Sequence, residues 1–393
     1  MSANLPLEIL PPVETAEVGR TLVVTNDFPP RVGGAQRYVH DLVRHLPADR
    51  ASVLAPRWPG WERFDETQPF PVVRFGTKRL APGPDLLRRV RSLIGETDSE
   101  VVLFGHGLPL AIMGPRLAAD PGLPYAVLTH GAEVWAAGIP GSARALWYAC
   151  SRANAVFAVS RYTAARVRPA VPADVPLVIL PPGVDTDRFR PDSSGREVRE
   201  RYDLDEAPVA VCISRMVTRK GQDVLIRGWR QVLRRVPEAR LLLVGDGPSR
   251  PRLEALAAEQ GVAWSVIFAG EVSEGALPSF YAAGDIFAMP CRSRKAGLEV
   301  EGFGIVFLEA AAMGLPVVAG NSGGAAEAVE EGETGLVVDG REVDAVARAV
   351  TELLEDPARA ATMGKSGRLR VEEDFAWPRV IERLAVGLQG GYS

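Results

Sequence analysis

The sequence predicts an α/β protein of two domains, each with its own parallel sheet. Short runs rich in Val, Ile and Leu alternate with amphipathic segments along nearly the whole chain. Buried parallel strands consist of such continuous apolar runs, and helices between them indicate βαβ units. A polar stretch at 186–208 interrupts this alternation, which then restarts. Since 393 residues suffice for two domains, we predict two Rossmann-like halves that join near residue 186.

The first half is predicted to contain a series of buried strands with helices between them. The strands are expected at 21–27, 51–56, 72–75, 101–106, 125–131, 155–160 and 177–185. Helical periodicity follows the first strand at 35–46. A second amphipathic segment, 82–95, carries Arg88, Arg89 and Arg91. This basic segment predicts either a helix lying on an anionic membrane surface or a helix that packs on the core.

The second half repeats the pattern. Its strands are expected at 209–215, 239–247, 266–272, 285–291 and 316–320. Helices are expected at 221–236, 342–355, 357–373 and 377–389, and the last has Pro378 in its first turn, where proline is well tolerated. Residues 1–19 are acidic, contain proline and lack the build of a secretion signal, so we expect a loose leader there.

Composition and charge exclude several classes of protein. With 45 Lys and Arg against 49 Asp and Glu, the net charge of −4 argues against a nucleic-acid binder. Three scattered cysteines are too few for a disulfide framework, which fits a reducing cytoplasm. No apolar run approaches the roughly 20 residues that a membrane span needs. We therefore expect a cytoplasmic protein, and peripheral attachment to the inner face of the cell membrane stays open.

Two candidate sites follow strands of the first half. Gly33 and Gly34 lie between the first strand and its helix, where glycine lets a ligand approach the backbone and the helix N-terminus attracts anions. An ordinary βα turn is the alternative. His130 follows the strand near 125–129, and His106 ends the strand before it. Open α/β sheets bind ligands at such strand ends, although a surface histidine with a local hydrogen bond is the simpler explanation.

A basic pair follows the first strand of the second half. Arg215 ends this strand, and Lys220 precedes the next helix. Arginine makes forked contacts to phosphate and lysine supplies a compact charge, so the two cations suit a diphosphate. Two solvated surface charges are the alternative.

The strongest pattern pairs two glutamates around a predicted helix start. Glu301 and Glu309 enclose seven residues that include Gly304. A helix beginning near Ile305 would direct the free N–H groups from about Gly304 to Val306 toward an anion. Glu301 would face the same space, and Glu309 could accept hydrogen bonds from a ribose diol. A helix-start carboxylate and a surface glutamate are the alternatives.

Together these motifs resemble the retaining glycosyltransferases of family four, which have the GT-B fold. The resemblance covers about residues 20–390. Within that family, bacterial phosphatidylinositol-mannoside mannosyltransferases are most similar to the segments RSRKAGLEVEGFGIVFLEA, SRMVTRKGQD and GLPVVAGNSGGAAE. The resemblance implies two Rossmann-like domains that face each other across a cleft: 20–186 with a returning helix at 376–393, and 187–375.

In this family the C-terminal domain binds the donor nucleotide sugar. Arg215 and Lys220 match the diphosphate-binding pair. Ile305 and Val306 match the amides that hold the distal phosphate. Glu309 matches the ribose ligand.

Other matched positions surround the sugar and the acceptor. Glu301 matches the carboxylate that orients the donor sugar, and His130 matches the histidine near the reacting carbon. Gly33 and Gly34 match a loop close to the diphosphate and the acceptor. The N-terminal domain of the family binds the acceptor.

Val272 and Glu274 fall in the region that contacts the base. Guanine offers two adjacent donors to a carboxylate and uracil offers one, which favours GDP; a helix N-terminal glutamate is the alternative. Cationic side chains and amides can stabilise the leaving phosphate, so we expect no cofactor and no metal ion. The pair Asp185 and Asp187 resembles a metal-binding D-x-D motif, but its place at a predicted turn favours local hydrogen bonding.

The expected reaction is transfer of a hexose, in the first instance mannose from GDP-mannose, to a hydroxyl group of a phosphatidylinositol mannoside. Arg292, Arg294 and Lys295 are expected either to meet an acceptor phosphate or to hold the active-site loop. An anionic membrane surface is a candidate partner, nucleic acid is not, and the sequence does not define the oligomeric state.

Other functions remain open on the sequence. Within the family, another nucleotide sugar and a soluble metabolite or cyclitol acceptor form the main alternative. A nucleotide-sugar 2-epimerase shares the two-domain architecture, although the paired glutamates favour transfer. A dinucleotide-dependent dehydrogenase and a non-catalytic nucleotide-sugar sensor are the remaining alternatives.

Overall fold

The computed structural model describes residues 18–391 except 77, 120–121 and 298. The chain forms two compact units: unit 2 spans Val184–Ala376, and unit 1 comprises the chain up to Gly183 and again from Trp377. The boundaries thus lie close to those expected from the sequence. Of the expected leader, only Val18 and Gly19 fall within the described residues, and Val18 is buried.

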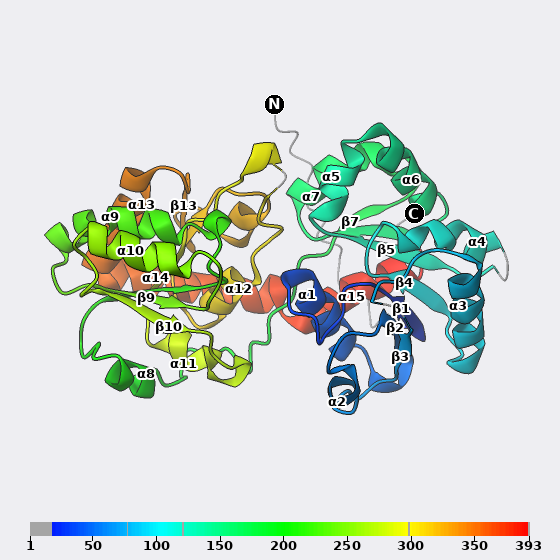
Figure 1. Cartoon of the computed structure of the whole chain (residues 1–393), viewed down its shortest axis with the longest axis horizontal. Coiled ribbons are helices and arrows are strands. Elements are labelled where there is room, and N and C mark those ends of the chain that lie inside the picture. The colour runs from blue at the N-terminus through cyan, green and yellow to red at the C-terminus, as the bar shows by residue number, and fades with distance from the viewer. Residues whose placement is uncertain (1–17, 77, 120–121, 298, 392–393) are drawn as a thin grey trace. The chain divides into compact units, whose positions relative to one another are not determined.

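Unit 1 is built on a seven-stranded parallel sheet of order β3-β2-β1-β4-β5-β6-β7 (Figure 1). The strands are β1 (Thr21–Val24), β2 (Ala51–Pro56), β3 (Val72–Phe75), β4 (Val101–Phe104), β5 (Tyr125–Thr129), β6 (Ala155–Ala158) and β7 (Leu177–Ile179). The chain order reverses between β1 and β4, and parallel α/β sheets bind ligands beyond the carboxyl ends of the strands at such a point.

Helices of unit 1 connect these strands. They are α1 (Gly34–Arg44), α2 (Trp61–Asp65), α3 (Pro84–Glu96), α4 (Gly114–Ala119), α5 (Ala132–Ala137), α6 (Pro140–Cys150), α7 (Arg161–Val167) and α15 (Trp377–Leu388). The closing helix α15 packs in unit 1, because Asn154 Nδ2 donates to the Leu388 carbonyl at 3.0 Å and His45 stacks on Trp377 with ring centroids 4.4 Å apart.

Unit 2 is built on a six-stranded parallel sheet of order β10-β9-β8-β11-β12-β13. The strands are β8 (Val209–Ile213), β9 (Arg240–Val244), β10 (Val266–Gly270), β11 (Ile286–Met289), β12 (Val317–Gly320) and β13 (Gly335–Val338). The helices are α8 (Arg196–Arg201), α9 (Gln222–Arg235), α10 (Arg250–Glu259), α11 (Leu277–Ala282), α12 (Ile305–Ala312), α13 (Val343–Glu355) and α14 (Pro357–Arg370).

These two sheets confirm the predicted α/β class with two Rossmann-like domains. The central strands are buried along their whole length, which explains their continuous apolar sequences. The sequence pattern did not predict β13, a four-residue strand at the edge of the sheet, where β12 is its neighbour. No helix in the described part of the chain is long and apolar enough to cross a membrane.

The basic helix α3 is a core-packing helix. Leu86, Val90 and Leu93 are buried in the apolar cluster of unit 1. Two of its arginines have acidic partners on the same helix, since Arg88 pairs with Asp85 and Arg89 Nη1 lies 2.6 Å from Glu96 Oε1. A helix whose apolar face is used by the core cannot also insert that face into a bilayer. Of the two interpretations of 82–95, the structure therefore selects core packing.

Candidate active site

Unit 2 carries a basic turn just beyond the end of β8. Arg215 is exposed, and the next residues form a short 3₁₀ turn, Thr218–Lys220. Gly221 then precedes α9 with φ 84°, and a Cβ there would collide with the Pro290 carbonyl. Only glycine fits this close approach. Lys220, at the end of this turn, is only 8% exposed.

Lys220 and Glu301 form an almost buried ion pair. Lys220 Nζ lies 2.7 Å from Glu301 Oε2, and Arg219 Nη1 donates to the same oxygen. The Glu301 main chain is fixed as well, because its N–H donates to Ser322 Oγ at 3.2 Å and its carbonyl accepts from Gly324 N at 3.0 Å. Burial alone would raise the pKa of the Glu301 carboxyl, but the charges of Lys220 and Arg219 outweigh it and hold this pKa below its ordinary value.

Arg292 binds the basic turn through its main chain and pairs with Asp223 through its side chain. Arg292 Nη2 donates to both carboxylate oxygens of Asp223, at 2.9 and 2.8 Å, and its main-chain N–H donates to the Arg219 carbonyl at 2.8 Å. Arg294 and Lys295 both pair with Glu299. All three cations of this segment therefore have partners within unit 2, which favours the loop-holding role among the two expected for them.

The predicted helix start is α12, preceded by Gly304 with φ 92°. Ile305 and Val306 open the helix and are half-buried, and the first N–H groups of a helix have no partner within it. Glu309, in the next turn, is only 1% exposed, and Tyr281 Oη donates to its Oε2 at 2.7 Å. The alternative of a surface glutamate at 309 is therefore wrong.

The expected base-binding segment follows β10. Val272 is half-buried and packs on the core of unit 2. Glu274 opens a short 3₁₀ turn, and its carboxylate is exposed. Arg188 Nη1 lies 3.7 Å from Glu274 Oε2, and Arg188 Nη2 donates to the Glu274 carbonyl. Asp185, in the same segment as Arg188, accepts N–H bonds from Asp187 and Arg188, which is the turn role expected for this aspartate.

Unit 1 presents a second group of polar residues, beginning with the loop after β1. Gly33 is extended and precedes α1; a Cβ on Gly33 would collide with the Gln36 amide, while Gly34 faces open space. The Gln36 amide nitrogen in turn donates to Asp27 Oδ1. A side chain at Gly33 would therefore displace Gln36 from Asp27.

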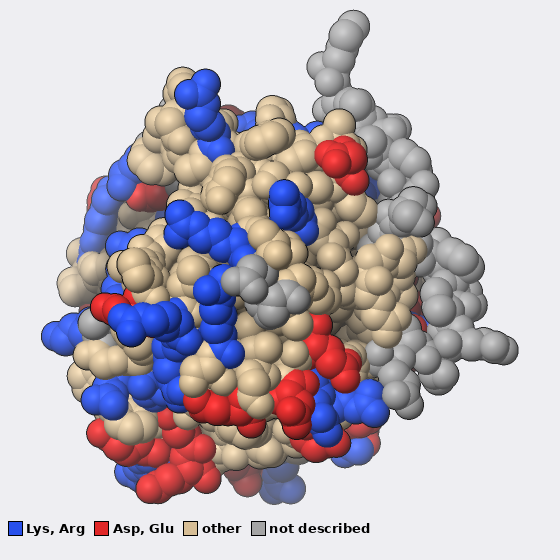
Figure 2. All heavy atoms as spheres, turned by 90° about the vertical axis from the view of Figure 1, so that its right-hand side faces the viewer, with Lys and Arg blue, Asp and Glu red and all other residues tan. Residues whose placement is uncertain are grey.

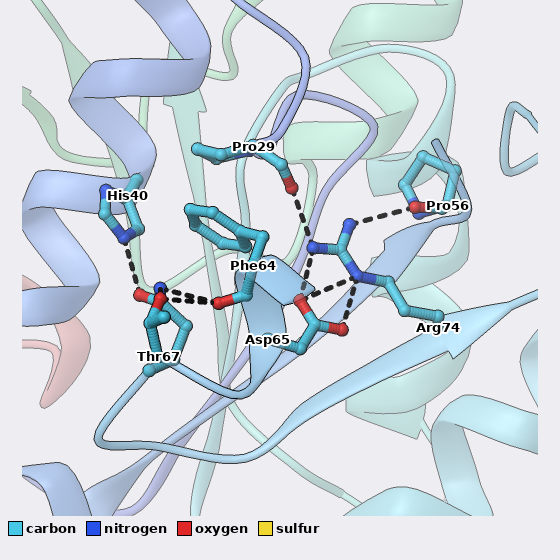
Figure 3. Close-up of polar contacts among 8 residues, drawn as sticks. Pro29, His40, Pro56, Phe64, Asp65, Thr67 and Arg74 are labelled. Carbon is cyan, nitrogen blue, oxygen red and sulfur yellow. Dashed lines mark hydrogen bonds and ion pairs between the residues drawn. The ribbon is translucent and has the colours of Figure 1, made fainter. Parts of the chain in front are cut away.

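Arg74 anchors the same loop from β3 (Figure 3). Its side chain is 1% exposed; Nη2 donates to the Pro29 carbonyl at 2.7 Å, and Nη1 donates to the Pro56 carbonyl at 3.0 Å. Asp65 neutralises the guanidinium and accepts two hydrogen bonds from Nε and one from Nη2. Because a buried charge needs such complete pairing, this arrangement fixes the chain that leads into the two glycines.

Three polar side chains meet at the ends of β1, β4 and β5. His106 Nε2 lies 3.3 Å from Asp27 Oδ2, and the rings of His106 and His130 have centroids 4.5 Å apart. His130 Nε2 lies 3.0 Å from the Gly105 carbonyl oxygen. His130 is 8% exposed, so the alternative of a surface histidine is wrong. Burial, reinforced by the neighbouring His106, lowers the pKa of His130 to about 4.

Sequence comparison places these features in a family. Residues 196–370 match the family "Glycosyl transferases group 1", and residues 32–188 match "Glycosyltransferase Family 4". A GDP-mannose-dependent alpha-(1-6)-phosphatidylinositol monomannoside mannosyltransferase of Mycolicibacterium smegmatis is 47% identical over 374 residues, 94% of this chain and 98% of the relative. This chain belongs to glycosyltransferase family 4.

Further similarities support the family 4 assignment. A GDP-mannose-dependent monoacylated alpha-(1-6)-phosphatidylinositol monomannoside mannosyltransferase of Corynebacterium glutamicum is 40% identical, covering 94% of this chain and 98% of the relative. Among solved structures, the Anabaena protein HepE in complex with UDP aligns with a TM-score of 0.81 at 22% identity, covering 94% of this chain and 99% of that chain. At that identity the structural match shows the shared fold.

In unit 2 of this family 4 glycosyltransferase, two of the predicted site residues come into direct contact. Lys220 contacts Glu301 directly, while Arg215, five residues before Lys220, is exposed. Arg219 was not among the predicted site residues, although the adjacent Arg-Lys pair before a helix was a signal for it. Supporting side chains such as Tyr281, which donates to Glu309, and Asp27, which pairs with His106, were not predicted either, because such partners leave no sequence motif.

Proposed function

We propose that this chain is a retaining mannosyltransferase that moves mannose from GDP-mannose to a hydroxyl group of a phosphatidylinositol mannoside. The observation that carries the proposal is the near-full-length similarity, at 47% and 40% identity, to relatives named for this donor and acceptor class. The cluster of Lys220, Arg219 and Glu301 supports it, because it provides cations for a diphosphate and a carboxylate for a sugar.

In this proposal unit 2 stabilises the departing nucleotide. Breaking the anomeric C–O bond leaves negative charge on the diphosphate, which Lys220, Arg215 and the N-terminal amides of α12 are suited to stabilise. Glu301 orients the sugar, and Glu309 accepts hydrogen bonds from the ribose diol. Since cationic side chains and amides supply the stabilisation, the reaction as proposed uses neither a metal ion nor a cofactor.

Retention of the anomeric configuration is assigned to attack from the leaving-group face. The acceptor hydroxyl approaches on that face, and a phosphate oxygen of the departing nucleotide accepts its proton. No covalent glycosyl-enzyme forms on this path. Mass spectrometry of the protein quenched during turnover should therefore show no added hexose, and a trapped adduct on a carboxylate would contradict this path.

A lipid acceptor implies contact with a membrane surface, and helix α6 of unit 1 exposes residue types that bind such a surface. Trp147 and Tyr148 are 49% and 42% exposed, while Leu146 on the opposite face is buried. Arg144 is exposed on the same helix, and the segment 134–153 contains no Asp or Glu. Exposed aromatic residues with a basic neighbour are typical of the interface of an anionic bilayer.

Figure 2 faces the end of unit 1 that carries α3 and α4 in Figure 1. Lys and Arg side chains are spread over the middle of this face, and Asp and Glu gather mainly toward its lower edge. We propose that unit 1 attaches peripherally to the cytoplasmic face of an anionic membrane, with α6 at the contact.

Vesicle sedimentation tests the membrane proposal. Phosphatidylcholine vesicles containing phosphatidylinositol should carry the wild-type protein into the pellet, and the double variant Trp147→Ser, Tyr148→Ser should stay in the supernatant. Trp264→Ser is the matched control, since Trp264 is 61% exposed but lies in unit 2. Equal sedimentation of the double variant and the wild type would contradict the assignment of α6.

A donor–acceptor matrix tests the reaction. GDP-mannose, UDP-glucose and UDP-N-acetylglucosamine are each combined with a phosphatidylinositol mannoside and with water-soluble cyclitols, and with no acceptor. Transfer from GDP-mannose to the lipid is the expected result. Transfer from a UDP-sugar alone would overturn the donor assignment, and an epimerised sugar without acceptor would indicate an epimerase.

Variants of the ion pair test the site. Glu301→Ala and Lys220→Ala should each lower the transfer rate by at least about a hundredfold, the effect of removing one preorganised electrostatic contact. Glu259→Ala and Lys365→Ala serve as controls, because both side chains are exposed in unit 2. Near-wild-type rates for both site variants would contradict the assignment of this site.

A further inference from the structure

Glu133 is a buried carboxylate with no role in the function proposed above. It lies in the first turn of α5, three residues after His130, and is 2% exposed. Its two oxygens accept from two different loops: Oε2 from the His130 main-chain N–H at 2.9 Å, and Oε1 from the Gly107 N–H at 3.0 Å. The carboxylate therefore ties the segment after β5 to the segment after β4.

The ring of His130 contacts the segment after β4. Its Nε2 lies 3.0 Å from the Gly105 carbonyl oxygen. A carbonyl oxygen only accepts hydrogen bonds, so Nε2 must carry the hydrogen. The neutral ring then has its lone pair on Nδ1, for which the described part of the chain provides no hydrogen-bond partner. Since the pKa of His130 is about 4, the ring is neutral at pH 7.

Both ends of the His130–Gly105 hydrogen bond thus depend on Glu133. It binds the main chain of the donor residue directly, and it binds the loop of the acceptor carbonyl through Gly107, two residues further on. That loop is tightly packed. A Cβ on Gly105 would lie 2.7 Å from Thr25 Cβ, and a Cβ on Gly107 would lie 2.7 Å from Leu146 Cδ1.

The surroundings of Glu133 keep its carboxyl ionised, the form in which both oxygens accept hydrogen bonds. Burial would raise the pKa of its carboxyl, but nearby His106 and His130 and the backbone N–H bonds outweigh it, so this pKa lies below its ordinary value. His106 is itself paired with Asp27, and the Tyr38 ring packs edge-on against His130 at 5.4 Å. An ionised carboxylate has two acceptor oxygens, whereas a glutamine amide has one.

We propose that Glu133 is a positioning residue that fixes His130 in the Nε2–H tautomer, so that Nδ1 accepts a hydrogen bond from a hydroxyl group of the bound substrate. The tautomer follows from unit 1 alone. The substrate hydroxyl rests on the proposed transferase function, and the two parts are therefore tested by separate measurements. His130 in this form can receive a hydrogen bond but cannot donate a proton from Nδ1 to a leaving group.

Nitrogen NMR of histidine-labelled protein tests the tautomer. The chain has four histidines, so the spectrum is simple, and a His130→Gln variant assigns the signal. In the wild type at pH 6, His130 should show a protonated Nε2 and an unprotonated Nδ1. A protonated Nδ1, or titration near the ordinary pKa of 6.5, would overturn the proposal without any further variant.

Glu133→Gln tests the role of the carboxylate, with Glu62→Gln as control because Glu62 is an exposed first-turn residue of α2. Glu133→Gln removes a negative charge that raises the pKa of His130, so His130 should still titrate no higher than about 4. The glutamine amide has one acceptor oxygen in place of two, so the variant should populate both tautomers. Gly107→Ala, whose Cβ would press on Glu133 Cγ at 3.2 Å, should disturb the same bond from the other side. An unchanged His130 signal in a folded variant would refute the role of Glu133.

Activity gives the second measurement. In Glu133→Gln, kcat/KM should fall at pH 7, because the tautomer with a protonated Nδ1 cannot accept the hydrogen bond of the substrate, while Glu62→Gln should keep the wild-type value. Failure of the proposed reaction in every variant would leave the NMR result intact. A shifted tautomer with an unchanged kcat/KM would overturn the substrate contact.

Discussion

Removing the ammonium group of Lys220 should destabilise unit 2 through Glu301. Lys220→Met keeps the length of the apolar stem but leaves Glu301 with Arg219 as its remaining charged partner. The side chains of Lys220 and Glu301 are 10% and 11% exposed, so solvent screens this pair weakly. Breaking a buried ion pair costs about 3–5 kcal/mol, and because Arg219 still binds the same oxygen, we expect the lower end, about 3 kcal/mol.

The cost should depend on pH in a defined direction. The folded-state pKa of Glu301 lies below its ordinary value of 4.5, so its contribution to stability is present above pH 4.5 and is lost as pH falls through the lowered pKa. In Lys220→Met the largest charge that lowers this pKa is gone. The difference in unfolding free energy between wild type and variant should therefore shrink as pH falls below 4.5.

A double-mutant cycle with Glu301→Gln provides the assay. Urea unfolding is followed by hydrogen exchange of β8 and α9, which reports unit 2 separately, since two units need not unfold together. Lys220→Met should cost much less in the Glu301→Gln background, giving a coupling energy of about 2 kcal/mol or more. A coupling energy below about 0.5 kcal/mol, or a cost independent of pH, would refute the reasoning.

Three further outcomes are expected. Tyr281→Phe removes a donor to the buried carboxylate of Glu309, so the free energy of unfolding should fall by about 1–3 kcal/mol. The KM for GDP-mannose should rise by a larger factor than kcat falls, and an unchanged KM in steady-state kinetics would contradict this. Arg215→Ala should leave unfolding free energy within about 0.5 kcal/mol in urea denaturation, because Arg215 is exposed, yet lower transfer at least about tenfold. The folded-state pKa of His130 lies below 6.5, so the unfolded chain binds the proton more tightly, and the free energy of unfolding should fall as pH drops from 6.5 to 4. Thermal melts of His130→Gln should show a weaker fall over this range. An equal fall would contradict the lowered pKa.

Local sequence was a sound guide to elements whose neighbours are close along the chain. The central strands were predictable because burial on both faces demands continuous apolar residues. The helix start at Ile305 was predictable because Gly304 and the apolar run after it are adjacent. Strand β13 escaped prediction, since four residues at a sheet edge carry too little pattern.

Amphipathic pattern alone could not settle what a helix face contacts. Helix α3 has the periodicity of a membrane-surface helix, but its apolar face is buried in the apolar cluster of unit 1. Helix α6 has a weaker pattern, yet its exposed Trp147 is found only by measuring what the fold leaves uncovered. The same sequence pattern therefore fits opposite environments, and packing decides between them.

By itself the sequence determined two parallel α/β halves, their helix starts and the residue types able to bind a nucleotide sugar. Only the tertiary structure decided which of those residues meet. Lys220 contacts Glu301 because β8 lies beside β11 in the sheet, and Glu133 reaches Gly107 because β5 lies beside β4. Strand order sets these contacts between distant parts of the chain, and a local pattern of residues carries no record of it.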